Sequence, residues 1–255
     1  MQKNQQVMYP EEREYSWQDG KKLTIGKKTL IMGILNVTPD SFSDGGKWNS
    51  VDRAVQHMLE MVVNGADIID IGAESSRPGF VTMSAKEEIE RLKPFLEAVL
   101  PACPVPVSID TFKAETAAYA AEQGVHMLND IWGLQYAEEP GEMAKVAAEY
   151  DLPVVVMHNR DSKVYKGDII DNMRAFFQRS IDIACEAGVK QENIILDPGI
   201  GFGKDVEGNL EVMNRLQELK KFAGHRYPLL LGTSRKSFIG NTLDLPVEDR
   251  MEPTG

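Results

Sequence analysis

Three side chains that can accept hydrogen bonds follow short runs rich in Val, Ile and Leu: Asp110, Asn129 and Asp197. Each one alone could cap the helix or turn that follows, as Asp and Asn often do. Three of them at neighbouring strand ends are harder to explain as caps. Two carboxylates and one amide could together bind a fused, nitrogen-rich heterocycle, which offers adjacent N–H donors and a carbonyl acceptor.

A second candidate group, Thr233-Ser234-Arg235-Lys236-Ser237-Phe238, lies where an apolar run passes into a predicted helix. Backbone N–H groups and the helix dipole favour an anion at such a position. Lys236 could be only a solvated cation at a helix start, or it could point toward the polar strand ends and a ligand carbonyl or ring nitrogen. Ser237 offers a hydroxyl to a carboxylate. The burial of Lys236 distinguishes the two alternatives.

Two polar loops complete the candidate groups. Residues 36–46 read N-V-T-P-D-S-F-S-D-G-G, and Asn36 and Asp44 offer hard oxygen ligands. Such ligands suit Mg²⁺ that also binds substrate phosphates, because Mg²⁺ keeps several waters and takes few protein ligands. Residues 74–79 read E-S-S-R-P-G and place Arg77 beside a rigid proline. A surface arginine is usually only solvated, but the position of this loop after a predicted strand favours a functional role.

The elements that must position these residues alternate along the chain. Seven short, continuously apolar runs predict parallel strands buried on both faces, and helical segments separate them. The runs are residues 30–35, 67–72, 105–110, 125–131, 153–158, 193–198 and 228–233. The predicted helices are residues 51–64, 84–99, 113–123, 140–150, 168–187, 206–221 and 235–244, with Ser50 and Ser84 as N-cap candidates.

The βαβα alternation predicts an α/β fold with a parallel sheet. Nearly every strand run ends in polar or glycine residues. An open sheet concentrates function at one switch point, whereas a barrel gathers all its strand ends around one site. The even distribution therefore favours a TIM (β/α)8 barrel, here with only seven strands evident. No G-x-G-x-x-G follows the first strand, so a dinucleotide site is not expected.

Residues 1–27 are predicted to form an N-terminal extension, and residues 28–255 the barrel. Asp19-Gly20 lies inside residues 15–25 and predicts the turn of a short β-hairpin. This hairpin is expected to cover the amino-terminal mouth of the barrel. We expect it to contribute packing and not catalysis.

Composition narrows the class of protein. The 255 residues are 42% hydrophobic and 26% charged, and the net charge is −11. That charge argues against a nucleic-acid partner, because neutralising phosphates requires a basic face. No apolar run approaches the roughly 20 residues that a membrane span needs. Cys103 and Cys185 lie far apart, which predicts neither a disulfide framework nor a zinc site and fits a reducing cytoplasm.

From about residue 28 to residue 255, the chain resembles the dihydropteroate synthase family. Seven ordered motifs carry the resemblance: residues 36–46 and 74–79, S-I-D-T at 108–111, N-D-I-W-G at 129–133, M-H-N-R at 157–160, D-P-G-I-G-F at 197–202 and L-G-T-S-R-K-S at 231–237. The resemblance implies a TIM barrel that condenses 6-hydroxymethyl-7,8-dihydropterin diphosphate with 4-aminobenzoate to 7,8-dihydropteroate and diphosphate. It also implies folate biosynthesis, bound Mg²⁺, a homodimer and inhibition by sulfonamides.

The same resemblance implies roles for residues at matching positions. The pterin would be bound by Asp110, Asn129, Ile131, Met157, Asp197, Phe202 and Lys236. The aminobenzoate site would comprise Phe42, Asp44, Ser76, Arg77, Pro78 and Ser237. Asn36 would bind the Mg²⁺ diphosphate, and the catalytic residues would be Asp44, Arg77 and Lys236. The implied mechanism is SN1-like: the C–O bond to diphosphate breaks first, and the aryl amine then attacks the pterin cation.

The chain departs from the family pattern in three places. Ala73 stands where the family commonly has Gly and Ser76 where it has Thr, which motivates the hypothesis of altered sulfonamide sensitivity. The sequence stops at Gly255, where the family continues with a helix, an eighth strand carrying an Arg-x-His motif, and a last helix. We interpret the chain as a fragment of a longer gene product and expect an unpaired sheet edge between the seventh and first strands.

Two alternatives to the synthase stay open at this point. Methyltetrahydrofolate methyltransferases share the pterin-binding acids, but they would not be expected to keep both D-S-F-S-D-G-G and S-R-K-S. A non-catalytic or truncated chain would bind pterin without releasing diphosphate.

Overall fold

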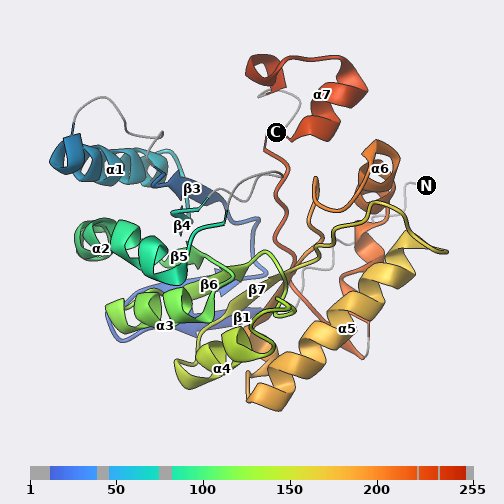
Figure 1. Ribbon diagram of the computed structural model, residues 1–255, viewed down its shortest axis with the longest axis horizontal. Coiled ribbons are helices and arrows are strands. Elements are labelled where there is room, and N and C mark those ends of the chain that lie inside the picture. Colours follow the sequence, from blue (N-terminus) through green and yellow to red (C-terminus); the bar gives the residue numbers. More distant parts are fainter. Residues whose placement is uncertain (1–11, 39–45, 75–81, 223, 235, 251–255) are drawn as a thin grey trace, which may run out of the picture.

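Six parallel strands form the centre of the molecule (Figure 1). The computed structural model describes residues 12–38, 46–74, 82–222, 224–234 and 236–250. The strands pair in chain order, each with the next along the sequence, which is the order of a barrel wall. They are β3 (Met32–Asn36), β4 (Ile68–Gly72), β5 (Val107–Asp110), β6 (Met127–Asp130), β7 (Val154–Met157) and β8 (Ile194–Asp197).

The seventh predicted strand lies beside β8 but pairs through a single bridge. Leu229 bridges Leu196 in parallel, the Leu196 N–H donates to the Pro228 carbonyl at 3.0 Å, and the Leu230 N–H donates to the Leu196 carbonyl at 2.9 Å. The order and direction predicted for all seven runs are therefore confirmed, although the last run is not a full strand. The fold is the predicted TIM-barrel type, with β3 and this segment at the two edges of the sheet.

Seven α-helices lie in the described part of the chain, and α1 to α6 surround the sheet as an open ring (Figure 1). They are α1 (Gly46–Val63), α2 (Ala85–Ala102), α3 (Ala114–Gln123), α4 (Glu142–Glu149), α5 (Ile169–Ala187), α6 (Val206–Asn214) and α7 (Ser237–Leu243). Short 3-10 helices at 191–193, 216–218 and 247–250 and a small antiparallel pair, β9 (Lys221–Phe222) and β10 (His225–Arg226), complete the structure.

Two predicted helix boundaries were wrong. Ser50 is not an N-cap, because α1 begins at Gly46 and no residue between the two positions excludes helix. The helix predicted over 206–221 ends at Asn214, where the Arg215 N–H is shared between the Glu211 and Val212 carbonyls and the chain tightens into a 3-10 turn. That turn brings Leu219, which is fully buried, into the core. Ser84 does cap α2, in a capping box with Glu87.

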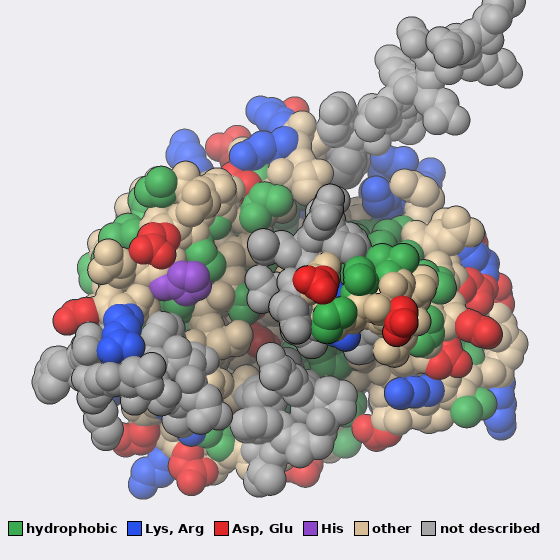
Figure 2. Space-filling model, turned by 90° about the horizontal axis from the view of Figure 1, so that it is seen from above, with side chains coloured by type: hydrophobic (Ala, Val, Ile, Leu, Met, Phe, Trp, Pro, Cys, Tyr) green, Lys and Arg blue, Asp and Glu red, His purple; other side chains and the backbone are tan. Residues whose placement is uncertain are grey.

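The open side of the ring exposes apolar side chains. Among the described residues β3 pairs only with β4, and Ile31 and Ile34 at this edge are both 56% exposed. Figure 2 looks onto this side from above and shows hydrophobic side chains both at α1 and at α7. Leu59 and Val63 of α1 and Leu243 of α7 are exposed hydrophobic residues of these two helices. The described residues thus contain the free sheet edge that the sequence predicts.

The N-terminal hairpin forms as predicted and covers the amino end of the sheet. It consists of β1 (Arg13–Ser16) and β2 (Lys22–Ile25), with Tyr15 opposite Leu23. These two side chains pack against apolar residues near the starts of four strands, namely Ile68, Met127, Val155 and Ile195. The hairpin therefore closes a small apolar cluster under the barrel. The division of the chain into two domains at residue 28 stays a prediction.

Polar contacts fasten the hairpin at its turn. The buried ring of His126 accepts from the Val107 N–H through Nδ1 at 3.0 Å, and its Nε2 lies 3.0 Å from the Asp19 carboxylate. Trp17 meets the same ring edge-on at 5.0 Å between centroids. His126 is thus a packed core residue. No helix in the described ranges is both long and apolar enough to cross a membrane.

Candidate active site

The carboxyl ends of the strands bring together the acceptors that the sequence singled out. Asp110 is the last residue of β5 and pairs in register with Asn129 of β6. Asp197 is the last residue of β8 and pairs with Met157, the last residue of β7. Because the sheet is parallel and its strands are short, these side chains lie at the same end of the barrel. Asp110 and Asn129 are neighbours, Asp197 lies two strands further along the sheet, and none of the three is the N-cap of the helix that follows it.

A buried carboxylate that the sequence analysis did not assign, Asp70 of β4, fixes the amide of Asn129. The Asn129 Nδ2 donates to Asp70 Oδ2 at 2.9 Å, which leaves the amide oxygen as the acceptor for a ligand. Asp70 Oδ1 has no partner among the described residues. Burial raises the pKa of Asp70, and the hydrogen bond from Asn129 opposes that rise. The available signal was an acid inside an otherwise apolar run.

Asp110 lies among other acids. Burial of its carboxyl group raises its pKa well above the usual range, and the nearby carboxylates of Asp70, Glu88, Asp130 and Glu74 raise it further. Two acids on adjacent strands of one interior favour a bound proton or a bound cation, because like charges at low dielectric repel. This end of the barrel therefore attracts positive charge.

The pKa of Asp197 is also raised, but only to about 6. Burial raises it, while the Gly199 N–H, which donates to Oδ1 at 2.7 Å, and the ammonium groups of Lys236 and Lys204 lower it. The carboxylate is therefore ionised at neutral pH although it is 7% exposed. An ionised, pre-oriented carboxylate can accept two adjacent N–H groups of one ligand.

The segment after Asp197 is held by a buried lysine that the sequence analysis also missed. Lys204 is 3% exposed, and its Nζ donates to the carbonyls of Gly199 and Phe202, each at 3.0 Å, and to His158 Nδ1 at 3.1 Å. Burial lowers the pKa of Lys204 to about 7. Burial and the neighbouring cations Lys204 and Arg160 lower the pKa of His158 to about 2, so this imidazole is a neutral acceptor and not an acid.

Lys236 is half-buried, and its ammonium group contacts the Phe202 ring. Its Nζ lies 4.2 Å from the centroid of the Phe202 ring, a cation–π distance, and its charge acts on Asp197. A Cβ at Gly201 would approach Lys236 Cδ to 3.1 Å, so the glycine leaves room for this side chain. The structure thus favours the functional alternative for Lys236, which lies at the N-cap position of α7.

Two apolar residues of the predicted pterin site lie beside these polar groups. Met157 is buried, and Ile131 is half-buried in the turn after β6. Asp130 shapes that turn by accepting from the N–H groups of Trp132 at 2.8 Å and Leu134 at 2.6 Å. Burial raises the pKa of Asp130 to about 7. Ile131, Met157 and Phe202 therefore offer apolar surface near the acceptors Asp110, Asn129 and Asp197.

Other predicted positions lie outside the described residues. These are Phe42, Asp44, Ser76, Arg77 and Pro78. Ser237 begins α7, but its side chain is not described.

Asn36 ends β3 and is exposed, so its amide oxygen is open to a ligand. Within the described ranges, no three His, Cys, Asp or Glu side chains group to hold a metal ion. The donor set at Asn36 therefore fits Mg²⁺ that arrives with its own phosphate and water ligands. The groove on α1, lined by Asp52, Val55, Gln56, Leu59, Glu60, Val63 and Asn64, contains no predicted site residue.

An α/β barrel whose strand ends present carboxylates, an amide and a lysine beside apolar side chains has the arrangement of an enzyme that acts on a small molecule. The sequence profile of the family described as "Pterin binding enzyme" matches residues 32–255. The match covers all six strands and every described site residue.

Known relatives narrow this class. A dihydropteroate synthase of Clostridium beijerinckii is 54% identical over 234 residues, which are 92% of this chain and 84% of the relative. The structure of the Clostridium difficile dihydropteroate synthase in the presence of pteroic acid superposes with a TM-score of 0.84 at 50% identity, covering 89% of this chain and 84% of that one. The Yersinia pestis dihydropteroate synthase in a sulfonamide drug complex gives 0.82 at 40% identity, covering 94% and 86%. The chain belongs to the dihydropteroate synthases, which are transferases of folate biosynthesis.

Proposed function

We propose that this chain joins 6-hydroxymethyl-7,8-dihydropterin diphosphate to 4-aminobenzoate at the carboxyl end of the barrel, by loss of diphosphate before attack of the amine. The observation that carries the proposal is the position of Lys236 Nζ, 4.2 Å from the centroid of the Phe202 ring and close enough for its charge to lower the pKa of the buried Asp197 carboxylate. Asp197 would accept the adjacent N–H groups of the pterin. Lys236 would donate to its carbonyl or ring nitrogen.

The remaining described residues would orient the pterin ring. Asp110 and the Asn129 amide oxygen would accept from the far edge of the heterocycle, since Asp70 occupies the amide N–H of Asn129. The ring itself would lie against apolar side chains of Ile131, Met157 and Phe202. This division places polar contacts at the ring edges and apolar contacts on its faces, as small-molecule sites usually do.

The proposed dissociative route follows from the charge of the site. As the C–O bond breaks, positive charge develops on the pterin, and the carboxylates of Asp70, Asp110 and Asp197 favour it. When bound at Asn36, Mg²⁺ would neutralise the charge of the departing diphosphate. The amine is a sufficient nucleophile for a cation, so the chain needs to orient it and exclude water.

The aminobenzoate site is proposed to comprise Phe42, Asp44, Ser76, Arg77, Pro78 and Ser237. We propose Asp44, Arg77 and Lys236 as the catalytic residues. Sulfonamides would compete at the same site, and the complex of the Yersinia pestis relative supports this inference.

We also propose a homodimer in the cytoplasm. Leu210 of α6 and Leu243 of α7 are exposed on adjacent helices and could belong to a subunit interface. Cys103 and Cys185 are both free thiols, which suits a reducing compartment. Sedimentation of the Leu243→Asp variant would test the dimer, because a charge there would shift the protein toward monomer.

The decisive experiment is 4-aminobenzoate-dependent release of diphosphate by the purified chain with Mg²⁺, compared with the Lys236→Ala variant. We expect release by the wild-type chain and a loss of about 100- to 1000-fold in the variant, as for removal of one donor that stabilises developing charge. Lys190→Ala is the matched control, since Lys190 pairs with Asp151 at an exposed position. Pterin binding without any release would instead support the non-catalytic alternative.

A further inference from the structure

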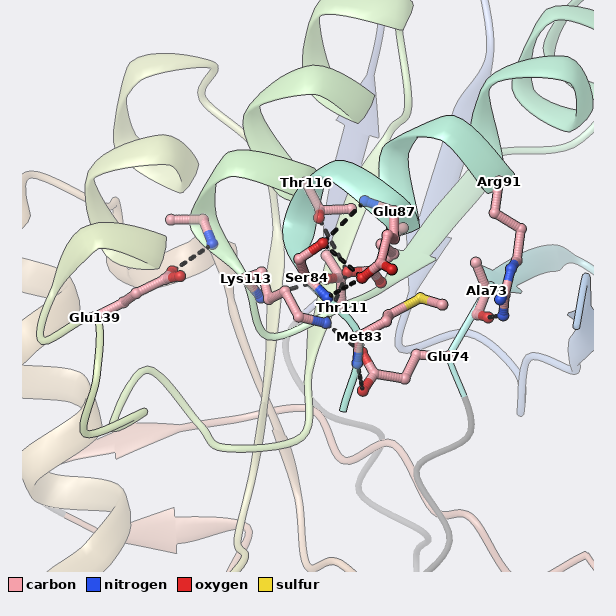
Figure 3. A network of polar contacts seen from close by, with 12 residues as sticks. Ala73, Glu74, Met83, Ser84, Glu87, Arg91, Thr111, Lys113, Thr116 and Glu139 are labelled. Carbon is pink, nitrogen blue, oxygen red and sulfur yellow. Dashed lines mark hydrogen bonds and ion pairs between the residues drawn. The ribbon is translucent and has the colours of Figure 1, made fainter. Parts of the chain in front are cut away.

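A buried cluster of charged side chains lies next to the site and has no place in the chemistry proposed above (Figure 3). Lys113, in the turn after β5, is 6% exposed and forms ion pairs with Glu74 and with Glu88 of α2, the latter at 3.0 Å. Glu88 is fully buried and also accepts from the Thr116 hydroxyl at 3.0 Å. One ammonium therefore serves two carboxylates, and the cluster keeps a net negative charge.

Stability alone gives a poor account of this cluster. Burying three charges costs desolvation that their attraction often fails to offset, and apolar replacements of buried ion pairs are frequently as stable or more stable. Glu88 Oε1 has no partner among the described residues, which adds a further cost. Buried charges of this kind are retained in several proteins because they fix one geometry.

The geometry that the cluster fixes is that of Glu74. This residue directly follows Ala73 at the end of β4, and its Oε1 accepts from the Met83 N–H at 3.2 Å while its other oxygen pairs with Lys113. Glu74 thus joins the two ends of the segment between residues 74 and 83. The Arg91 guanidinium holds the first end as well, donating to the Ala73 carbonyl at 2.7 Å (Figure 3).

Lys113 also connects this junction to the pterin side of the barrel. It lies three residues after Asp110, and its own N–H donates to the Thr111 hydroxyl at 3.3 Å. The Thr111 N–H in turn donates to the Asn129 carbonyl at 3.2 Å. Lys113 and Thr111 therefore link the ends of the 74–83 segment to the strand ends that carry Asp110 and Asn129.

We propose that Glu74, held by Lys113 and Glu88, is a positioning residue for 4-aminobenzoate. It fixes both ends of the segment that contains Ser76, Arg77 and Pro78 relative to the pterin site. The inference rests on the proposed function, which assigns those three residues to aminobenzoate. Glu74 acts through the ends of that segment, so its loss is expected to change the binding of 4-aminobenzoate and not of the pterin.

The test variant is Glu74→Ala, because it leaves the Lys113–Glu88 pair intact and removes no cation from the interior. We expect the KM for 4-aminobenzoate to rise about tenfold, as for a modest misplacement of binding groups, while the dissociation constant of pterin is unchanged. Glu74→Gln keeps one oxygen acceptor but turns its NH2 toward the other donor, either Lys113 or the Met83 N–H, so its KM should lie between those of the wild type and Glu74→Ala. In the wild type the Met83 amide should exchange with deuterium more slowly than in Glu74→Ala.

Glu139→Ala is the matched control. Glu139 is a neighbouring carboxylate that accepts from the Ala114 N–H at 2.7 Å, one residue from Lys113, and the structure gives it no contact with Glu74. It should lose stability without a change in the KM for 4-aminobenzoate. An unchanged KM in Glu74→Ala, or an equal rise in Glu139→Ala, would overturn the inference.

A measurement of 4-aminobenzoate binding tests the positioning role of Glu74 independently of catalysis. A wild-type chain that releases no diphosphate would contradict the function. Equilibrium dialysis of labelled 4-aminobenzoate, with pterin, inorganic diphosphate and Mg²⁺ present, would still measure whether Glu74→Ala weakens binding about tenfold. Weaker binding by Glu74→Ala would support the positioning role of Glu74. Equal binding by the wild type and Glu74→Ala would contradict it.

Discussion

The two ends of the same six strands differ in what they bury. At the amino end, the hairpin covers an apolar cluster of Tyr15, Leu23 and neighbouring strand residues. At the carboxyl end, carboxylates and lysines are buried beside one another, and burial raises the pKa of Asp70 and Asp110. Strand sequence, not strand geometry, makes this difference, since both ends share one sheet. The amino end stabilises the fold and the carboxyl end holds the chemistry.

Backbone conformation differs between the ends in the same way. Gly199 and Gly203, both after β8, have φ values of +63° and +55°. A Cβ at Gly199 would lie 2.1 Å from the His158 carbonyl oxygen. At the hairpin turn, Gly20 also has positive φ, yet nothing lies within 4 Å of its missing Cβ. Gly199 is therefore required by close backbone approach as well as by its positive φ, whereas Gly20 is required only by the conformation of the hairpin turn.

The largest expected effect follows from that contrast. Gly199→Ala should lower the free energy of unfolding by about 3 kcal/mol or more, because it combines a left-handed backbone with a clash against main chain. Gly188→Ala, at the end of α5, adds the same handedness strain but meets only the Ala148 methyl at 3.9 Å, so about 1 kcal/mol is expected. Urea denaturation measures both, and equal losses would contradict the comparison.

A smaller effect should separate stability from activity. Leu23→Ala, in the apolar cluster at the amino end, should cost about 2 kcal/mol of unfolding free energy, as for loss of a buried leucine side chain. Its kcat/KM should stay within about twofold at a temperature where the variant is folded, since the apolar cluster under the hairpin contains none of the described site residues. Leu59→Ala on the exposed face of α1 is the control for stability. A folded Leu23→Ala variant with much lower activity would break the division between the two ends.

The smallest effect is a pH dependence of opposite sign for binding and for stability. The folded state raises the pKa of Asp197 from 3.8 to about 6, so it holds this proton more tightly than the unfolded chain. The contribution of Asp197 to stability is therefore greatest below about pH 4 and declines as pH rises to about 6. Pterin binding requires the ionised form and should weaken about tenfold for each pH unit below 6.

Calorimetry with 6-hydroxymethylpterin measures how the dissociation constant changes between pH 5 and 8. This ligand carries no diphosphate that would itself titrate. Asp110, whose pKa is also raised, would act in the same direction. In Asp197→Asn, the stability contribution that declines between pH 4 and 6 should disappear. Binding that stays constant from pH 8 to 5 would show that the ionised Asp197 is not the acceptor.

Much of the fold was predictable because its signals are local. Short apolar runs, alternation with helical segments and the Asp19-Gly20 turn each depend on a few adjacent residues, and the structure confirms the strand order and the hairpin. The misplaced end of α6 depends on a tertiary contact, the burial of Leu219 in the core. Among the site residues, Asp110, Asn129 and Asp197 were found because polar residues at strand ends are visible in the sequence.

Asp70, Lys113 and Lys204 were not predicted as functional residues, and the reason is the same for each. Their roles come from partners 25 to 59 residues away along the chain or from carbonyl groups, and no local pattern records such contacts. A lysine in a polar loop is normally solvated. Only the folded chain shows that Lys113 and Lys204 are almost completely buried.

The sequence by itself determined the order of the elements, the family and the acids at the strand ends, because periodicity, turn chemistry and motif order are properties of neighbouring residues. Tertiary structure alone decided which charges are desolvated, which pKa values move and which residue holds another in place. Those properties depend on distances between segments far apart in the chain and on the exclusion of water, which arise only when the barrel wall assembles.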